Sequence, residues 1–221
     1  MKLGLVAMSG VRAANPELTA IGLTLPGFVE RSKVIASLPS LSLLTLAALT
    51  PPDVEVEYRE IVDLRAEPEL PRDWDLVAIS TYSGQVLDAY RLADACRERG
   101  VPVVMGGLHV TARPGEARAH GATAVVGEGE VSWPRVIEDF RRGGLRDEYR
   151  PAEGEWFDLA DAPMPRYELL DVSRYNRLTV QTSRGCPHRC DFCASSILLT
   201  PKYRVKPVEM VIAEVRRIRE L

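Results

Sequence analysis

The chain has 221 residues, of which 46% are hydrophobic and 27% are charged, so it is long and apolar enough to bury a core. Lysine and arginine number 28 against 31 aspartate and glutamate residues, which gives a formal net charge of -3. Because nucleic-acid-binding surfaces usually carry clustered positive charge, we expect no nucleic-acid partner.

The apolar stretches at the start of the chain predict neither export nor membrane insertion. The run "MKLGLVAMSG" breaks at Ser9 and Gly10, which is too short for a signal peptide. The longest stretch, "LPSLSLLTLAALTPP", holds roughly a dozen residues between prolines, whereas a spanning helix needs roughly 20. We therefore predict a cytoplasmic protein with no membrane span, in which this stretch forms a buried helix.

Apolar runs in the first two thirds of the chain alternate with helical patterns. The runs predict strands over "LGLVAM", "VEVEYRE", "DLVAIST", "VPVVMGG" and "ATAVVGEGE". Helices are expected from about residue 40 to 49, over "GQVLDAYRLADACRERG" and over "EVSWPRVIEDFRRGG". This alternation predicts an α/β domain over residues 1–143, flavodoxin-like (Rossmann-like), with a five-stranded parallel sheet and helices on both faces.

Ligands of such sheets bind outside the carboxyl ends of the strands. The loops expected there are "MSGVRAANP", "STYSGQ", "GGLHVTARPG" and "GEGE". A dinucleotide is not the expected ligand, because "GEGEVS" carries only Gly127 and Gly129 and follows the fifth strand instead of the first.

The remainder of the chain predicts a linker and the beginning of a second domain. Residues 144–176 are rich in proline and show no sustained period. Residues 177–221 predict a strand over "RLTVQTS", a loop with three cysteines, and an amphipathic helix over "KPVEMVIAEVRRIREL". One strand and one helix cannot close a core, so we expect this domain to be incomplete and the chain to be the amino-terminal part of a longer protein.

The loop "SRGCPHRCDFCASS" places Cys186, Cys190 and Cys193 close together. Such a cluster more often binds metal than forms disulfides in a reducing compartment. Structural zinc needs four ligands, and His188 could supply the fourth, although alternate positions on so short a loop would converge only with strain. An iron–sulfur cube held by three cysteines leaves one iron open for a small molecule. Both metals remain alternatives at this point.

The stretch "SRGCPHRCDFC" resembles the cluster loop of radical S-adenosylmethionine (SAM) enzymes, whose C-x3-C-x-aromatic-C pattern is met by Cys186, Cys190, Phe192 and Cys193. The resemblance implies a partial TIM barrel, of which residues 177–221 would be the first strand, loop and helix. It implies that the three cysteines hold a 4Fe–4S cluster, that its open iron chelates SAM, and that Phe192 lies near the adenine.

The same resemblance implies the chemistry. One electron from the reduced cluster would cleave SAM to a 5′-deoxyadenosyl radical, which would take hydrogen from a small-molecule substrate. A flavodoxin or ferredoxin would supply the electron.

A second resemblance covers the amino-terminal half. The series "LPSLSLLTLAALTPPDVEVEYREI", "AISTYSGQ", "VPVVMGGLHVTARPGEA" and "AVVGEGEVSWP" is similar to the cobalamin-binding domain found in front of many radical SAM enzymes. Glycines would let the cobalamin tail approach the backbone, and hydroxyl side chains would donate hydrogen bonds to it. The predicted contacts are Ser80, Thr81, Ser83, Gly106, Gly107, His109, Gly127, Glu128 and Gly129.

One departure from the classical cobalamin-binding pattern concerns the first loop. That pattern has Asp-x-His-x-x-Gly after the first strand, whereas "MSGVRAANPELTAIG" contains no histidine. His109 follows the fourth strand and is expected to support the fold or the tail. The resemblance therefore implies base-off cobalamin without a protein histidine ligand, its lower face covered by loop residues such as Leu41 to Leu44.

Together the two resemblances imply a cobalamin-dependent radical SAM enzyme that transfers a methyl group to an unactivated carbon. No catalytic residue beyond the three cluster ligands is predicted, and residues 1–221 alone are expected to be inactive. Two alternatives remain open. One is radical cyclisation or rearrangement without net methylation, and the other is a non-catalytic cobalamin-binding module with a vestigial or zinc-filled cysteine loop.

Overall fold

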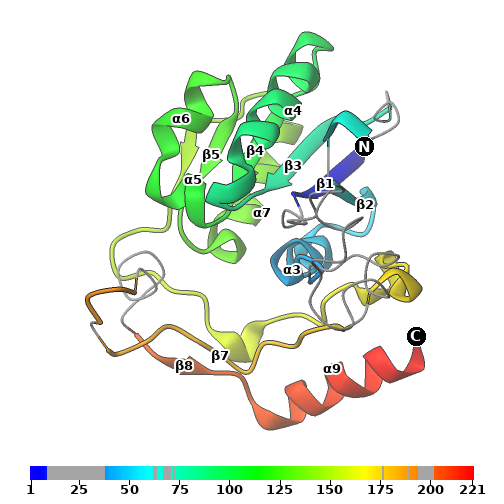
Figure 1. Cartoon of the computed structure of the whole chain (residues 1–221), viewed down its shortest axis with the longest axis vertical. Coiled ribbons are helices and arrows are strands. Elements are labelled where there is room, and N and C mark those ends of the chain that lie inside the picture. The colour runs from blue at the N-terminus through cyan, green and yellow to red at the C-terminus, as the bar shows by residue number, and fades with distance from the viewer. Residues whose placement is uncertain are drawn as a thin grey trace, which may run out of the picture.

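The computed structural model describes residues 1–8, 38–61, 64–66, 71, 73–175, 177–188, 190–193 and 202–221. Figure 1 shows a sheet with helices on both of its faces, followed by a carboxyl-terminal part that ends in a single helix. The predicted loop "MSGVRAANP" lies almost entirely outside the described residues.

Within the described residues the sheet has six strands, and every neighbouring pair in it is parallel. The strands are β1 (Lys2–Met8), β2 (Glu55–Ile61), β3 (Leu76–Ser80), β4 (Val103–Gly106), β5 (Thr123–Val125) and β6 (Glu148–Tyr149). Their order is β2-β1-β3-β4-β5-β6, so the predicted flavodoxin-like sheet is confirmed.

The predicted number of five strands is wrong, because β6 adds a sixth from within the predicted linker. Glu148 and Tyr149 pair with Ala124 and Val125 of β5. A strand of two residues carries no alternation of apolar and polar side chains, so nothing local in the sequence indicates it.

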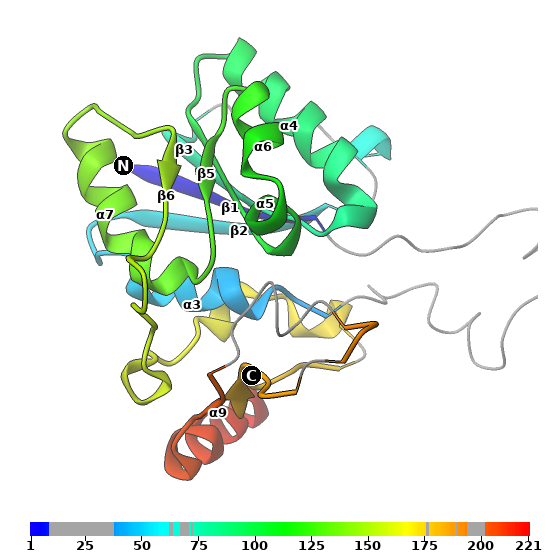
Figure 2. The same ribbon diagram turned by 90° about the vertical axis from the view of Figure 1, so that its left-hand side faces the viewer.

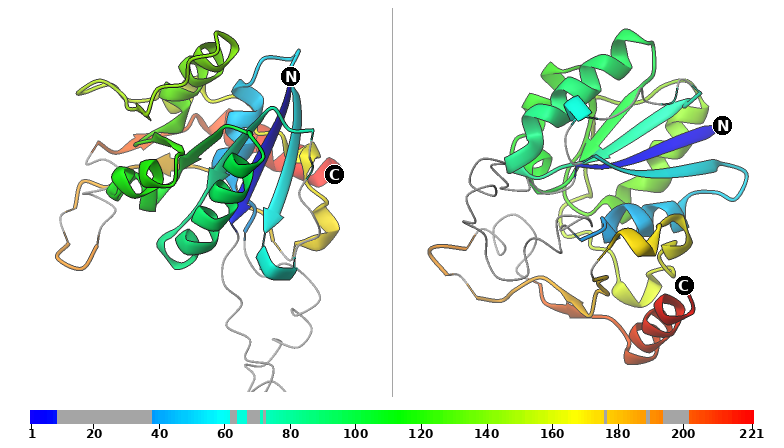
Figure 3. Two further views of the ribbon diagram at one scale, coloured as in Figure 1. Left: turned by 90° about the horizontal axis from the view of Figure 1, so that it is seen from above. Right: turned by 45° about the vertical axis from the view of Figure 1, so that its right-hand side comes forward.

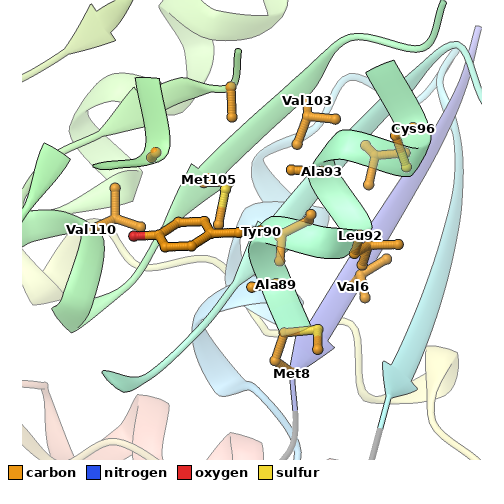
Figure 4. Close-up of a cluster of buried hydrophobic side chains, with 14 of the residues drawn as sticks. Val6, Met8, Ala89, Tyr90, Leu92, Ala93, Cys96, Val103, Met105 and Val110 are labelled. Carbon is orange, nitrogen blue, oxygen red and sulfur yellow. The ribbon is translucent and has the colours of Figure 1, made fainter. Parts of the chain in front are cut away.

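Helices cover the sheet in two layers (Figures 1 and 3). On one face lie α4 (Val86–Glu98), α5 (Leu108–Ala112) and α6 (Pro114–Ala119), and on the other lie α3 (Leu41–Leu49) and α7 (Gly129–Arg141). Alternate residues of each strand face opposite layers. Figure 4 shows the first layer, where Val6 and Met8 of β1 and Met105 of β4 pack against Ala89 and Leu92 of α4.

Helix α3 begins where the sequence predicts the buried helix. The hydroxyl of Ser40 accepts a hydrogen bond from the Leu43 N–H at 3.4 Å and caps the amino terminus of the helix. Leu43 and Ala47 face the sheet, whereas Leu44 faces the carboxyl-terminal part. Short 3₁₀ turns complete the described structure, at Leu64–Ala66, Ser83–Gln85, Leu159–Asp161, Tyr167–Leu169 and Val172–Arg174.

The predicted linker packs underneath α3, as Figure 2 shows. Tyr167 and Leu170 bury their side chains against Leu44, and the Arg166 N–H donates to the Leu44 carbonyl at 3.1 Å. This contact joins the sheet domain to the part of the chain that carries the cysteines.

The carboxyl-terminal part has an antiparallel pair, β7 (Ser183–Arg184) and β8 (Arg204–Val205), and helix α9 (Val208–Glu220). The strand predicted over "RLTVQTS" forms only at Ser183, because residues 177–182 have no strand beside them within the described parts of the chain. The predicted apolar face of α9 is largely exposed at Val208, Ile212 and Val215, which are 68%, 44% and 45% accessible. Ile218, on the last turn, packs against the cluster of Leu44 and Tyr167. None of the helices in the described residues is both long and apolar enough to cross a bilayer.

Candidate functional site

A cavity of about 380 Å³ opens at the carboxyl ends of β3, β4 and β5, between the sheet and helices α3 and α7. This volume suits a small ligand or one part of a larger one, because small-molecule sites commonly measure about 300–1,000 Å³. The wall on the sheet side is made of small apolar side chains, and α3 and α7 contribute larger ones. These residues are Ala78, Val104 and Val125 on the sheet side and Leu43, Leu46 and Trp133 on the helix side.

Glycines form the rim of the cavity and keep it open. Gly107 has φ +105°, and a Cβ there would lie 2.5 Å from the Thr81 carbonyl oxygen. Gly129, the first residue of α7, would bring a Cβ to 3.5 Å from a Leu46 methyl group and so into the cavity. Helix α7 begins at this rim, and the amino terminus of a helix favours a polar or anionic ligand.

Six of the nine residues predicted to contact cobalamin line this cavity, and three do not. The six are Ser80, Gly106, Gly107, Gly127, Glu128 and Gly129. Thr81 is buried and its hydroxyl donates to the Tyr82 carbonyl at 3.2 Å, while Ser83 and His109 bond to each other. The structure thus gathers the predicted glycines at one place, and Leu43 of the segment expected to cover cobalt lies in the same wall.

His109 has a partner at each ring nitrogen. Its Nδ1 lies 2.9 Å from Ser83 Oγ and its Nε2 lies 3.0 Å from Glu116 Oε2. The Tyr90 hydroxyl donates to the same carboxylate oxygen at 3.1 Å. The hydrogen bonds from His109 and Tyr90 lower the pKa of Glu116 below its usual range. His109 therefore links the loop after β3 to α6 and does not line the cavity.

Two largely buried ion pairs, which we call the roof, lie where the carboxyl-terminal part meets the cavity, and Glu128, Glu130 and Arg184 of these pairs line the cavity. Arg184 of β7 donates to Glu130 through both terminal guanidinium nitrogens, at 2.5 and 3.2 Å. Arg204 of β8 binds both carboxylate oxygens of Glu128, and its Nη1 also donates to the Phe157 carbonyl at 2.6 Å. Gln181 accepts from Arg184 at 2.9 Å and lines the cavity beside it.

Burial and pairing act against each other in the roof. Burial alone would raise the pKa of Glu128, but hydrogen bonds from Arg204 and the Phe157 N–H hold that pKa below its usual range. Burial alone would lower the pKa of Arg184, but Glu130 raises it above the usual value. Pairing therefore favours the charged forms of Glu128 and Arg184 in spite of their burial.

Sequence reasoning missed the roof. It predicted Glu128 as a contact of cobalamin but paired neither Glu128 nor Glu130 with an arginine. The partners are separated by 54 and 76 residues along the chain, so no local pattern connects them. The sequence offered one indication of charged partners, which is that both glutamates lie in "GEGE", one of the predicted ligand-binding loops.

The cysteine loop begins two residues after Arg184. Cys186 and Cys193 are half-buried, Cys190 is exposed, and Phe192 is 93% accessible. The Cys193 N–H donates to the Cys190 carbonyl at 3.0 Å, which closes a turn around Phe192. Among the described residues, all three cysteines included, no three histidine, cysteine or acidic side chains lie close enough together to hold a metal ion. Three cysteine thiolates are suitable ligands for an iron–sulfur cluster. To bind one cluster together, their sulfur atoms would have to lie closer to one another than they do here.

The sheet order and the cavity at its carboxyl edge define an α/β cofactor-binding domain. Residues 51–137 match the family model of the B12 binding domain. The chain is also 31% identical over 83% of its length to the uncharacterized methyltransferase sll1242 of Synechocystis, of which it covers 34%. It is 30% identical over 77% of its length to bacteriochlorophyllide d C-8(2)-methyltransferase of Chlorobaculum tepidum, of which it covers 39%.

A solved structure shares the fold over nearly the whole chain. It is the radical SAM methyltransferase TsrM of Kitasatospora setae with cobalamin and a 4Fe–4S cluster bound, with a TM-score of 0.60 and 17% identity. The match covers 98% of this chain and 45% of that one. The family model confirms the resemblance of the sheet domain to a cobalamin-binding domain, and the solved structure confirms the fold over nearly the whole chain. The chain spans little more than a third of the length of the curated relatives it matches.

Proposed function

We propose that this chain is the cofactor-binding part of a cobalamin-dependent radical SAM enzyme that methylates an unactivated carbon of a small molecule. The observation that carries the proposal is the position of the glycine-rimmed cavity, which is roofed by the hairpin that leads into the three-cysteine loop. The similarity to two methyltransferases supports methyl transfer over cyclisation or rearrangement.

In this proposal the cavity takes the nucleotide tail of cobalamin. The backbone at Gly106, Gly107 and Gly129 would lie along the tail, and Ser80 would offer a hydroxyl to it. His109 is held by Ser83 and Glu116, which supports base-off cobalamin without this histidine as a cobalt ligand.

The three cysteines would bind the 4Fe–4S cluster, and the exposed ring of Phe192 would be available to pack against the adenine of SAM. Bound together, cluster and SAM would supply the radical, and cobalamin the methyl group. An electron donor such as flavodoxin or ferredoxin, and a cytoplasmic location, belong to the same proposal.

The cavity is tested by filling it. We expect hydroxocobalamin to co-elute with the wild-type chain on a sizing column. Gly129→Leu should weaken binding at least about tenfold, because its side chain would occupy the space expected for the tail. Gly84→Ala is the matched control, since a Cβ there has nothing within 4 Å and Gly84 does not line the cavity. A folded wild-type chain that does not bind hydroxocobalamin would exclude cobalamin from the proposal.

The cluster is tested by anaerobic reconstitution with iron and sulfide. The wild-type chain should turn brown, and replacement of Cys186, Cys190 and Cys193 by Ala should abolish the colour. Cys96→Ala is the control, because Cys96 is buried on α4 among apolar side chains. A colourless chain that retains one zinc ion and still binds cobalamin would favour a non-catalytic cobalamin-binding module.

A further inference from the structure

The Glu130–Arg184 pair lies at the junction of the cavity and the cysteine loop. Both side chains line the cavity. Arg184 is separated from Cys186 only by Gly185, whose φ of +87° turns the chain immediately after the arginine. Arg184 is thus the last side chain anchored to the sheet domain before the first cysteine.

The pairing of β7 with β8 depends on the two glutamates. Arg184 and Arg204 are direct cross-strand partners in the antiparallel pair. Side chains at such positions stand on the same face, and like charges there repel each other. Glu128 neutralises Arg204, and Glu130 neutralises Arg184, which also lies 3.7 Å from Glu128. Glu128, at the residue before α7, and Glu130, in the first turn of α7, therefore stabilise the hairpin from which the cysteine loop extends.

Burial makes this pair different from the surface ion pairs of the same helix. The side chains of Arg184 and Glu130 are 16% and 7% accessible, whereas those of Arg142 and Glu138, also paired on α7, are 72% and 56% accessible. Breaking a buried pair leaves an unneutralised charge, while an exposed pair contributes little. The position of Glu130 in the cavity wall and the position of Arg184 are therefore tied to each other.

We propose that Glu130 and Arg184 are positioning residues that couple occupancy of the cavity to the arrangement of the cysteine loop. A cobalamin tail packed against Glu130 holds the pair in place, which favours the loop arrangement that accepts a cluster. Because coupling between two binding sites is reciprocal, an assembled cluster strengthens cobalamin binding by the same factor. This inference rests on the proposed function.

The coupling is measured as a ratio of dissociation constants. Hydroxocobalamin is titrated anaerobically into the full chain, before and after cluster reconstitution, and its absorbance gives Kd in each state. In the wild type we expect the cluster to tighten binding about fivefold or more, the lower end of typical allosteric coupling. In Glu130→Gln and in Arg184→Gln the ratio should fall towards one. The double variant should show no further loss, because both substitutions remove the same interaction.

Two variants separate positioning from a general loss of structure. Glu138→Gln removes a carboxylate from the exposed pair of α7 and should keep the wild-type ratio. Arg184→Lys keeps the charge but loses the two-pronged contact, so it should show an intermediate ratio. This variant decides the question if the glutamine variants do not fold. As a second readout, adding cobalamin should change the electron paramagnetic resonance spectrum of the reduced cluster in the wild type but not in Glu130→Gln.

The outcomes are distinct. Absence of hydroxocobalamin binding or of a cluster in the wild type would overturn the proposed function and the coupling together. Normal binding of both with a wild-type ratio of one would overturn the coupling and leave the proposed function standing. So would an unchanged ratio in folded Glu130→Gln or Arg184→Gln, or in Arg184→Lys.

Discussion

Gly107 shows how a single backbone conformation shapes the cavity. Its φ of +105° is unfavourable for any residue with a Cβ, and the Thr81 carbonyl oxygen lies 2.5 Å from where that Cβ would be. We expect Gly107→Ala to lower the free energy of unfolding by about 1–3 kcal/mol, as measured by urea denaturation. Gly84→Ala, which meets no atom within 4 Å, should change it by less than about 0.5 kcal/mol. Equal effects of the two substitutions would contradict the conclusion that the backbone conformation at Gly107 requires a glycine.

Glu128 predicts a pH dependence. Its pKa is lower in the folded state, so its ion pair stabilises the fold above the unfolded-state pKa of glutamate, about 4.3. That contribution disappears as the pH falls through the lowered pKa, where the carboxylate takes up a proton. Glu128→Gln should therefore be less stable than the wild type at pH 7, and the difference should shrink as the pH falls below about 4. Urea denaturation between pH 7 and pH 3 measures the difference in unfolding free energy between the two proteins. A difference that does not change with pH would contradict a stabilising role for the ionised Glu128 carboxylate.

Helix α3 is the element that contacts both the sheet and the segment after it. Leu44 is fully buried against Tyr167 and Leu170 on the side away from the sheet. Leu44→Ala should cost about 2–5 kcal/mol of unfolding free energy, because it leaves a cavity at this junction. Leu87→Ala on α4, where the side chain is 69% exposed, is the control and should be close to neutral. A neutral Leu44→Ala would mean that the junction contributes little to stability.

The carboxyl-terminal part is held by another buried pair. Lys206 and Glu214 form an ion pair with side-chain accessibilities of 3% and 2%, and the Tyr167 hydroxyl donates to Glu214 at 3.4 Å. Glu214→Gln should lower the unfolding free energy by about 3–5 kcal/mol, because it leaves a buried lysine charge unpaired. Replacing both partners, as Lys206→Met with Glu214→Leu, should cost less than the single change. Additive losses in thermal or urea denaturation would show that the two side chains do not act as a pair.

At the scale of the whole molecule, periodic patterns predicted the fold well and long-range contacts poorly. The strands and helices of the sheet domain follow from apolar runs such as "DLVAIS" and from the spacing of Val86, Ala89, Ala93 and Cys96 on α4, because burial on one face imposes those periods. The glycine loops followed from the rule that parallel sheets bind ligands at their carboxyl edge.

The contacts that join the two parts carry no such pattern. Glu130 and Arg184 are distant in sequence, and each resembles an ordinary surface charge until the fold buries both. For helix α9 the sequence predicted the element but not its packing. Its spacing predicts a helix correctly but does not say which neighbour covers its apolar side.

The order of the strands also bears on how copies of this chain behave towards one another. A sheet edge with unpaired backbone groups can recruit a strand from another molecule and begin aggregation. Among the described strands one edge is β6, which has only two residues, and the other is β2, which carries Glu55, Glu57 and Arg59 at alternate positions. A short edge and a charged edge both disfavour strand addition, so the sheet that supports the cavity is also protected from polymerising through its margins.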